Sequence, residues 1–324
     1  MIITGSDTSF CYDTSESDYG NLPQGWSYKE TAGVCVDEKD RVYVFSRSEH
    51  PVIVLDNSGK VINHWGERIF TLPHGIALGP DDSIYCIDAG DHTVRKFDRQ
   101  GKLLMTLGEP GKSSGRLSGE PFNGPTHVGV NQQTGEFFVS DGYSNARVHK
   151  YTPDGERVLS WGQSGTDPGE FNTVHNIAID SNGRVYVADR ENHRVQVFSS
   201  TGEFQTQWVN MAMASCIWID QSDNGLVYVG EFYAGIPQNE GGMGNWTGNR
   251  LGPRITILDQ NGEVVSRLGD QPIGESAGQF VAPHGIAVNS IGDIFLAEVS
   301  WSAYGIRQDP PREIRSLQKL TRRS

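Results

Sequence analysis

The stretch that decides the fold reads Val174-His-Asn-Ile-Ala-Ile-Asp180, then Val185-Tyr-Val-Ala-Asp189, then Arg194-Val-Gln-Val-Phe198. Each of the three segments is short and rich in β-branched or aromatic residues, which is typical of a β-strand. Turn residues separate and follow them, Ser-Asn-Gly at 181–183 and Ser-Thr-Gly at 200–202. The stretch therefore predicts a small antiparallel sheet whose second strand ends in an acid.

The same unit occurs six times along the chain. The second segments of the six units, five of which end in an acid, are Val42–Ser46, Ile84–Asp88, Phe137–Asp141, Val185–Asp189, Val227–Glu231 and Ile294–Glu298. A fourth segment closes several units on Trp-Gly or Leu-Gly, as at Trp65-Gly66 and Leu107-Gly108. Four short strands in each repeat of about 40 residues are the signature of a β-propeller. We therefore predict an all-β fold, a six-bladed β-propeller.

The repeats resemble NHL repeats, because they carry an Asp-x-x-x-x-Arg-Val pattern such as Asp189–Val195 and lack the marker dipeptides of WD40 repeats. The sixth repeat has no clear outer strand after Leu317–Leu320. Residues around Trp26–Glu30 precede the first repeat and can supply that strand, so that an N-terminal strand would close the ring. The predicted organisation is one propeller domain at 25–324 after an N-terminal extension at 1–24.

Two insertions interrupt the repeats. Residues Glu109–Pro125 separate repeats two and three, and the Gly-rich Phe232–Pro253 lies inside repeat five. Because binding residues are often carried on loops, Phe232–Pro253, which contains Trp246, is either a lid over the central pore or a plain surface loop.

Composition disfavours several classes of protein. The net charge of −13 argues against nucleic acid and anionic membranes as partners, because both require a basic face. No apolar run approaches the roughly 20 residues that a membrane helix needs, and the first residues lack the features of a signal peptide. The four cysteines are scattered without paired metal-ligand spacing and fit ordinary thiols. We predict a cytoplasmic protein that binds neither nucleic acid nor membrane.

Histidine opens the first segment of every second repeat. The six residues at this position are Ala32, His74, Thr126, His175, Ser215 and His284. In a closed six-fold ring, alternate blades lie about 120° apart, so the three imidazoles would converge on the axis. Three histidine nitrogens with an open fourth position are typical of a catalytic zinc. The alternative is that each histidine only caps a strand and hydrogen-bonds a neighbouring carbonyl, but packing alone gives no reason to skip every second blade.

The other histidines show no such register. They are predicted to be ordinary surface or turn residues and are His50, His64, His92, His127, His149 and His193.

A second set of polar residues follows the middle strands, at the same end of the predicted propeller. It contains Arg47, Tyr143 and Arg190. A guanidinium at the mouth of a metal pore can clamp a carboxylate bidentately, which predicts a small carboxylate-bearing substrate. The alternative is that arginines in these turns pair with the acids that end the middle strands.

At these residues the chain resembles the peptidyl-α-hydroxyglycine α-amidating lyases, also called peptidylamidoglycolate lyases. The resemblance runs from about Ala32 to Ala297 and is strongest in Leu72–Ile76, Phe138–Arg147, Val187–Asn192 and Pro283–His284. It implies that a six-bladed propeller holds a zinc ion through His74, His175 and His284. It also implies that Tyr143 is a catalytic general base, that Arg47 and Arg190 are active-site arginines, and that a carbinolamide is cleaved to an amide and glyoxylate.

The sequence departs from the family pattern at the structural calcium. The family has an aspartate directly after its third zinc-binding histidine, and here that position is Gly285. Only the main-chain carbonyls of Val34 and Ile76 match the remaining calcium ligands, so a calcium ion is the weaker of the two metal expectations. The family's disulfides are also missing, because the matching positions hold Ser144, Tyr186 and Val197.

Three functions compete on these observations. The leading prediction is an enzyme, a metal-dependent carbon–nitrogen lyase that cleaves a small α-hydroxy-amide with zinc. A metal-dependent hydrolase of a lactone, ester or amide would use the same residues, but it would add water to its product. A non-enzymatic NHL-type scaffold would bind a partner on its face and would need no stoichiometric metal.

Overall fold

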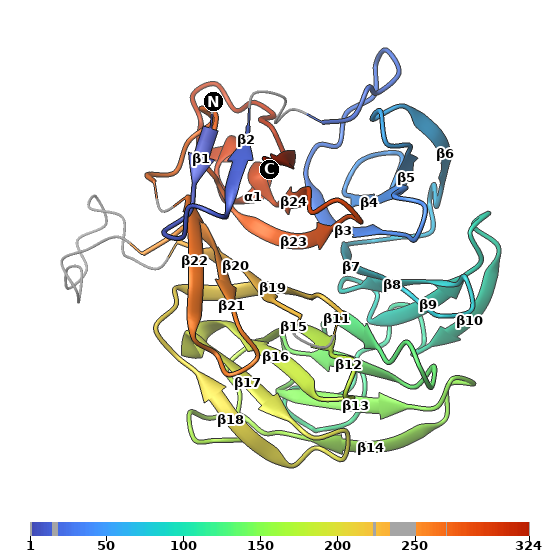
Figure 1. Cartoon of the computed structure of the whole chain (residues 1–324). Helices are drawn as coiled ribbons and strands as arrows, with labels where there is room; N and C mark the ends of the chain where they lie inside the picture. The colour runs from blue at the N-terminus through green and yellow to red at the C-terminus, as the bar shows by residue number, and fades with distance from the viewer. Residues whose placement is uncertain (1, 15–18, 223–224, 234–250, 270, 324) are drawn as a thin grey trace.

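Six antiparallel sheets stand around a central axis (Figure 1). The computed structural model describes residues 2–14, 19–222, 225–233, 251–269 and 271–323. The innermost strand of each sheet contacts the innermost strands of the two neighbouring sheets, and the last of them contacts the first. The prediction of a closed six-bladed β-propeller is therefore confirmed.

The first five blades have four strands each, hydrogen-bonded in chain order. Their strands, innermost first, are β3 (Thr31–Val36), β4 (Val42–Ser46), β5 (Val52–Leu55) and β6 (Val61–Trp65); β7 (Pro73–Leu78), β8 (Ile84–Asp88), β9 (Thr93–Phe97) and β10 (Leu103–Leu107); β11 (Pro125–Val130), β12 (Phe137–Asp141), β13 (Arg147–Tyr151) and β14 (Arg157–Trp161); β15 (Val174–Ile179), β16 (Val185–Asp189), β17 (Arg194–Phe198) and β18 (Phe204–Trp208); β19 (Met213–Ile219), β20 (Val227–Phe232), β21 (Arg254–Leu258) and β22 (Val264–Gly269).

The sixth blade joins the two ends of the chain. Its strands, innermost first, are β23 (Pro283–Val288), β24 (Ile294–Glu298), β25 (Leu317–Arg322), β2 (Cys11–Asp13) and β1 (Ile2–Thr4). Tyr12 of β2 lies opposite Arg322 of β25, so an N-terminal strand closes the ring, as predicted.

The predicted position of the closing strand is wrong. Residues 26–30 form no strand, and the Trp26 ring instead stacks on His50. Residues 2–13, which were expected in an extension before the propeller, contribute the two outer strands of the sixth blade. The physical reason is burial: Tyr12 and Phe10 are enclosed in the apolar cluster between blades five and six, and that burial stabilises a strand too short to show a pattern in the sequence.

Burial differs between the middle and the outer strands. The second strands β4, β8, β12, β16 and β24 are buried at every residue, because neighbouring blades cover both faces of each sheet. Strands covered on both faces read as continuous apolar runs rather than as alternating patterns. The outermost strand β18 is exposed along most of its length. The core is therefore a ring of apolar layers between blades.

In the five blades whose middle strand ends in an acid, that acid holds the start of the innermost strand. Asp88 accepts hydrogen bonds from the main-chain N–H groups of Thr71 (2.6 Å) and Leu72 (2.8 Å). Four other acids take the N–H group of the corresponding segment in the same way: Asp141 from Asn123, Asp189 from Asn172, Glu231 from Ala212, and Glu298 from Ala282. Because these buried carboxylates need such donors, each of these five repeats fixes the residue that opens its innermost strand.

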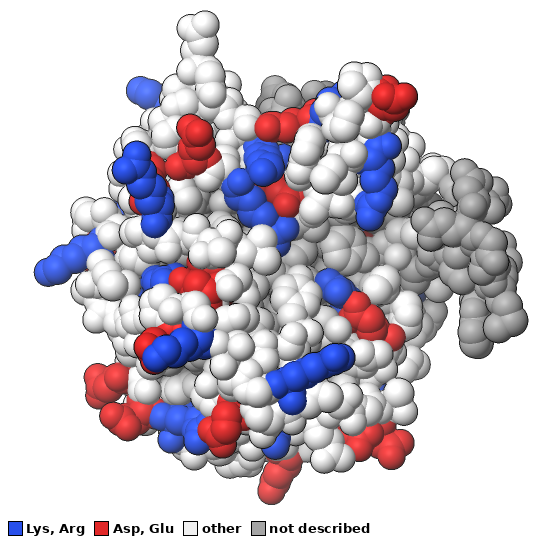
Figure 2. All heavy atoms as spheres, turned by 180° about the vertical axis from the view of Figure 1, so that it is seen from behind, with Lys and Arg blue, Asp and Glu red and all other residues white. Residues whose placement is uncertain are grey.

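Helical structure in the described part of the chain is limited to α1 (Ser300–Ala303) and the 3₁₀ turns η1 (Arg190–Asn192) and η2 (Gly305–Arg307). None of the described helices is long and apolar enough to cross a membrane. Figure 2 shows basic and acidic side chains interspersed over one face of the molecule.

Candidate metal centre

Three histidines from alternate blades meet on the axis. His74, His175 and His284 open β7, β15 and β23 beside the first residue of each strand. One ring nitrogen from each lies within 4.8 Å of the others, and the ring centroids are 4.5, 4.7 and 5.0 Å apart. All three side chains are buried. The structure therefore brings together the residues that the alternation in the sequence singled out.

The other nitrogen of each ring is bound to the main chain of the next blade. In every case Nδ1–H donates to the carbonyl of the residue at the same repeat position, which is one of the small residues in the alternation. The bonds, each 2.6 Å long, run from His74 to Thr126, from His175 to Ser215, and from His284 to Ala32. A proton fixed on Nδ1 leaves the Nε2 lone pair free to face the axis. Strand capping and axial convergence, weighed above as alternatives, occur together.

Burial keeps these imidazoles neutral. It is the largest cause that lowers the pKa of His284 to about 3, and the positive charge of Arg47 lowers it further. Burial also holds the pKa of His74 and of His175 well below the ordinary value for histidine, with the nearby imidazoles and the arginines adding to the effect. Zinc binds neutral imidazole, and its histidine ligands usually donate their second N–H to a carbonyl. The donor set therefore fits a zinc ion.

Metal-free protein should lose stability as the pH falls below about 6.5, the ordinary pKa of histidine in an unfolded chain. Because the folded-state pKa of His284 is about 3, the unfolded chain binds a proton that the folded chain does not bind between these pH values. The free energy of unfolding should then fall by up to about 1.4 kcal/mol per pH unit for each such histidine. Urea unfolding of EDTA-treated protein at several pH values between 7 and 4 measures this slope.

The matched pair for that measurement is His284→Asn and His193→Asn. The amide of the first can still donate to the carbonyl of Ala32 but does not titrate, so its slope should be shallower than that of the wild type. His193 is exposed and has a φ of 54°, a conformation that asparagine tolerates, so its replacement should leave the slope unchanged. Equal slopes for His284→Asn and wild type would contradict a neutral imidazole at this position.

Tyr143 places a hydroxyl group between two of the three imidazoles. Its oxygen is 2.7 Å from Nε2 of His74 and 3.3 Å from Nε2 of His175. Because both nitrogens are acceptors, the hydroxyl donates to His74. The residue is 41% exposed, so solvent and a substrate can reach it. Burial of the hydroxyl raises the pKa of Tyr143, and the charges of Arg190 and Arg47 oppose that shift.

The insertion Glu109–Pro125 contacts the main chain of Tyr143. The N–H group of Tyr143 donates to the carbonyl of Gly124 (3.1 Å), at the end of the insertion Glu109–Pro125. Gly124 has a φ of +76°, and a Cβ there would lie 2.7 Å from the Cβ of Tyr143. Only glycine meets both requirements without a shift of the backbone. The insertion therefore positions the tyrosine.

Arg47 is held beside the histidines by a buried acid. Its Nη1 donates to Oε1 of Glu30 (2.8 Å), and its Nε donates to the carbonyl of Pro73 (3.0 Å), the residue before His74. The other oxygen of Glu30 accepts from the main-chain N–H group (2.7 Å) and the hydroxyl (2.9 Å) of Ser302. The arginine thus pairs with an acid, though not with one that ends a middle strand. Sequence reasoning missed Glu30, which stands just before the first repeat.

Arg190 lies between aromatic side chains of two blades. Its guanidinium carbon is 5.8 Å from the ring centroid of Tyr143 and 5.7 Å from that of Phe232. Its Nε and Nη2 both donate to Oε1 of Glu191, at 3.0 and 2.7 Å. The acid that ends the middle strand, Asp189, pairs with Arg194 instead (2.7 Å). Arg47 and Arg190 are therefore both fixed near the histidines by carboxylates outside the repeat pattern.

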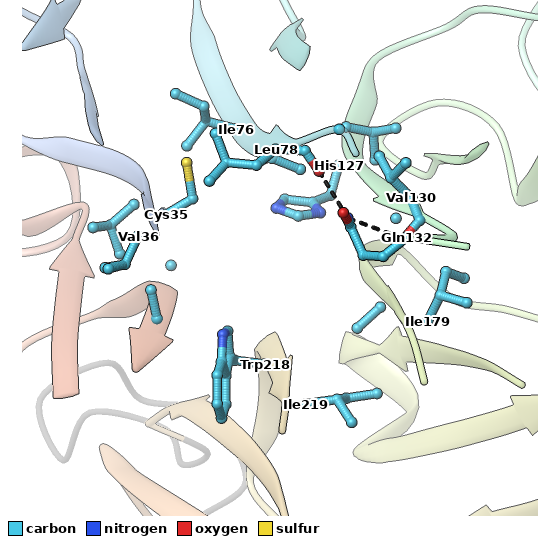
Figure 3. Close-up of a pocket in the computed structure, with 18 of the residues that line it drawn as sticks. Cys35, Val36, Ile76, Leu78, His127, Val130, Gln132, Ile179, Trp218 and Ile219 are labelled. Carbon is cyan, nitrogen blue, oxygen red and sulfur yellow. Dashed lines mark hydrogen bonds between the residues drawn. The ribbon is translucent and has the colours of Figure 1, made fainter. Parts of the chain in front are cut away.

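A separate cavity of about 580 Å³ lies at the other end of the innermost strands (Figure 3). Its wall is mostly aliphatic, with Ile76, Leu78 and Ile179 among its side chains, and His127 also lines it. The expectation that His127 is a surface or turn residue is wrong, because it lies on the innermost strand β11 and lines this cavity. There burial lowers its pKa to about 4. The three convergent imidazoles lie at the opposite end of these strands.

The residues that match the family's calcium ligands lie in the same cavity, but they do not fit a calcium ion. Val34, Ile76 and Gly285 all line the cavity, but a Cβ at Gly285 would lie 2.9 Å from the Cα of Gly33. An aspartate would therefore require the backbone to shift. Calcium usually takes six to eight oxygen ligands, including carboxylates, so the described residues here do not fit it.

Two further predictions concern His149 and the insertion Phe232–Pro253. His149 is fully buried and bonds Ser160 (2.7 Å) and Asp141 (3.4 Å), so the expectation that it lies on the surface is wrong. The interior of the insertion Phe232–Pro253, including Trp246, lies outside the described residues.

Comparison with known proteins supports the resemblance. A family model described as "NHL repeat" matches residues 171–198. "Peptidyl-alpha-hydroxyglycine alpha-amidating lyase 1" from Drosophila melanogaster is 33% identical over 271 aligned positions, and the alignment covers 78% of this chain and 47% of that protein. This chain is an NHL-repeat relative of the peptidyl-α-hydroxyglycine α-amidating lyases. The resemblance stated from the sequence is thus confirmed.

Longer amidating proteins are related to this chain as well. "Peptidyl-glycine alpha-amidating monooxygenase B" from Xenopus laevis is 26% identical over 329 residues, covering 90% of this chain and 35% of that protein. The chain thus spans about half or less of the length of these relatives. A solved structure titled "Streptogramin B lyase structure" aligns over 94% of this chain and 96% of its own, with a TM-score of 0.55 and 12% identity, and it supports the propeller fold alone.

Proposed function

We propose that this relative of the amidating lyases is a zinc-dependent lyase. Its substrate would be a small α-hydroxy-amide that carries a carboxylate, and its products an amide and glyoxylate or a related carbonyl acid. The main support is the convergence of three neutral Nε2 atoms on the axis with the Tyr143 hydroxyl 2.7 Å from one of them. His74, His175 and His284 would hold the ion. Zinc, when bound, supplies a Lewis acid that makes a neighbouring hydroxyl group more acidic.

The side chains around the histidines match the remaining needs of the reaction. In R–CO–NH–CH(OH)–COO⁻, the carboxylate would bind Arg47 and Arg190, both already oriented by their own acids. As a phenolate, Tyr143 would accept the proton of the α-hydroxyl group. Burial raises the pKa of this tyrosine, and the two guanidinium charges favour the phenolate against that effect. The C–O bond then becomes C=O, the C–N bond breaks, and the amide nitrogen takes a proton. No water is consumed.

The products of α-hydroxyhippurate test this proposal. Zinc-loaded protein should release benzamide and glyoxylate in equal amounts, and EDTA treatment should abolish the release. A hydrolase acting on the same amide would instead form benzoate, labelled with ¹⁸O when the reaction runs in H₂¹⁸O. Benzoate as the product would contradict the lyase and favour the metal-dependent hydrolase. If the protein shows no turnover and binds no stoichiometric zinc, the non-enzymatic NHL-type scaffold would be favoured.

Glu30 should act as a positioning residue for Arg47. Glu30→Gln keeps the size of the side chain but removes the charge that fixes the guanidinium through the 2.8 Å bond. A hydrogen bond between charged groups contributes about 1.5–3 kcal/mol, so kcat/KM should fall by about ten- to a hundredfold, mostly through a higher KM. Steady-state kinetics with α-hydroxyhippurate measure the change. Zinc content should stay the same.

The control for Glu30→Gln is Glu49→Gln. Glu49 is an exposed acid two residues after Arg47, so its replacement makes the same change of charge without touching that contact. Its kinetics should match those of the wild type. An unchanged KM in Glu30→Gln would show that substrate binding does not depend on the orientation of Arg47.

A further inference from the structure

A second group of side chains that could bind a metal ion lies beside the outer strands of blade one. His64 belongs to β6, His50 precedes β5, and Glu67 follows β6. Nδ1 of His50 is 3.2 Å from Oε1 of Glu67, and Nδ1 of His64 is 2.7 Å from the same oxygen. One ligand atom from each of the three residues lies within 4.8 Å of the others. Both histidines were expected to be ordinary surface or turn residues. His64 is indeed exposed, and the structure shows in addition that the two histidines share one carboxylate. The axial histidines, in contrast, open innermost strands.

The antiparallel pairing of β5 and β6 builds this group. Val52 lies opposite Trp65, and Ile53 lies opposite His64. His50 precedes Val52 by two residues and Glu67 follows Trp65 by two, so these two side chains stand opposite each other just beyond the ladder. The arrangement therefore follows from strand register, which holds the three groups together more firmly than a contact between loops would.

Trp26 covers the group from the N-terminal segment. Its ring stacks on His50 with centroids 3.5 Å apart and an interplanar angle of 20°. The edge-on contact with His64 has a centroid distance of 4.9 Å and an angle of 82°. The indole thus fixes the orientation of both imidazoles and leaves them few rotamers to lose when a ligand binds.

We propose that His50, His64 and Glu67 form a binding site for a divalent transition metal, separate from the axial histidines. Two imidazoles and one carboxylate are a donor set that zinc accepts, with a fourth position left for water or another ligand. A tetrahedral ion with bonds of about 2.0–2.2 Å holds its ligand atoms about 3.3 Å apart. The N–O separations of 3.2 and 2.7 Å are close to that spacing, and all three ligand atoms lie within 4.8 Å of one another.

The metal-free and metal-bound forms differ by a tautomer. Without metal, each Nδ1 carries a proton and donates it to Glu67. With metal, the proton of each neutral ring moves to Nε2, and Nδ1 and the carboxylate oxygen bind the ion. The ion takes the place of two hydrogen bonds that already point at one centre, so the site is organised before it binds.

Zinc titration of the EDTA-treated protein tests the proposal. Wild type should bind two zinc ions per chain by isothermal titration calorimetry. His74→Ala/His175→Ala should keep only the site in blade one, and His64→Ala should keep only the axial site with its lyase turnover unchanged. Glu67→Gln should weaken zinc binding at the site in blade one at least tenfold. Glu49→Gln, a nearby change of charge, should leave zinc binding at both sites unchanged. No zinc bound by His74→Ala/His175→Ala, or two zinc ions in His64→Ala, would overturn the proposal.

Tryptophan fluorescence gives a second test that does not depend on the axial site. In His74→Ala/His175→Ala, added Ni²⁺ should quench part of the fluorescence, because Trp26 lies against two of the three ligands. That part of the quenching should disappear when either Trp26→Phe or His64→Ala is added to this double variant. Circular dichroism should show that both triple variants remain folded. Quenching that survives His64→Ala would mean that nickel binds elsewhere, and the site in blade one would be rejected.

Discussion

Replacing His175 should remove zinc from the axis and lower kcat/KM for α-hydroxyhippurate by at least about a thousandfold, a loss of about 4 kcal/mol in transition-state stabilisation. Two Nε2 atoms would remain, and catalytic zinc sites in proteins typically use three protein ligands. The variant to make first is His175→Gln, because its amide can still donate to the carbonyl of Ser215 that Nδ1 now occupies at 2.6 Å. Metal analysis and steady-state kinetics on the same preparation measure both effects.

Two comparisons separate loss of zinc from loss of fold. His175→Ala leaves the buried carbonyl of Ser215 without its donor and should lower the free energy of unfolding by about 1–3 kcal/mol more than His175→Gln does. His193→Asn, which changes an exposed histidine, should keep both zinc and turnover. Full zinc content with normal turnover in His175→Gln would show that the axial histidines serve the fold rather than the chemistry.

The axial histidines could be found from the sequence because a propeller repeats its register. Equivalent positions in the repeats occupy equivalent places around the axis. The shared repeat position of His74, His175 and His284 was therefore enough to predict that their side chains converge. The same register explains the acids that end the middle strands. The sequence marked them as a pattern, but only the structure shows that each of them holds the start of the innermost strand of its own blade.

The residues that sequence reasoning missed lie outside the repeat or act across it. Glu30 joins Arg47 to Ser302, which is 272 positions away, and no local pattern marks such a contact. The closing strand at Cys11–Asp13 has only three residues, so the burial of Tyr12 decides it rather than any alternation. Pairings between distant segments are set by tertiary packing, which overrides local preference.

The pair His50 and His64 shows the same limit within one blade. The two histidines lie 14 positions apart with no periodicity that links them. They meet because Val52 lies opposite Trp65 in the ladder between β5 and β6. A register is fixed by the turn and by the buried face of a sheet. The register between β5 and β6 can be derived only when the exact residues at which both strands begin and end are known.

Tyr143→Phe should leave zinc bound and lower kcat by about a hundred- to ten-thousandfold, the usual contribution of a positioned acid or base. The ring would still lie against Arg190, whose guanidinium carbon is 5.8 Å from its centroid, so the variant removes only the oxygen 2.7 Å from His74. KM should change little, because the carboxylate contacts are assigned to the arginines. Metal analysis, kcat and KM on one preparation measure all three expectations.

Tyr19→Phe is the matched control for that result. It removes a tyrosine hydroxyl that donates to the main chain of Asp56 (2.8 Å) in blade one, so it should cost some stability and leave kcat unchanged. A kcat in Tyr143→Phe within a few fold of wild type would remove Tyr143 as the base. The proton of the α-hydroxyl group would then have to leave by another route, while the metal centre itself would stand. Loss of zinc in the same variant would instead make the tyrosine part of the metal-binding set, because its oxygen already lies within 3.3 Å of two of the three Nε2 atoms.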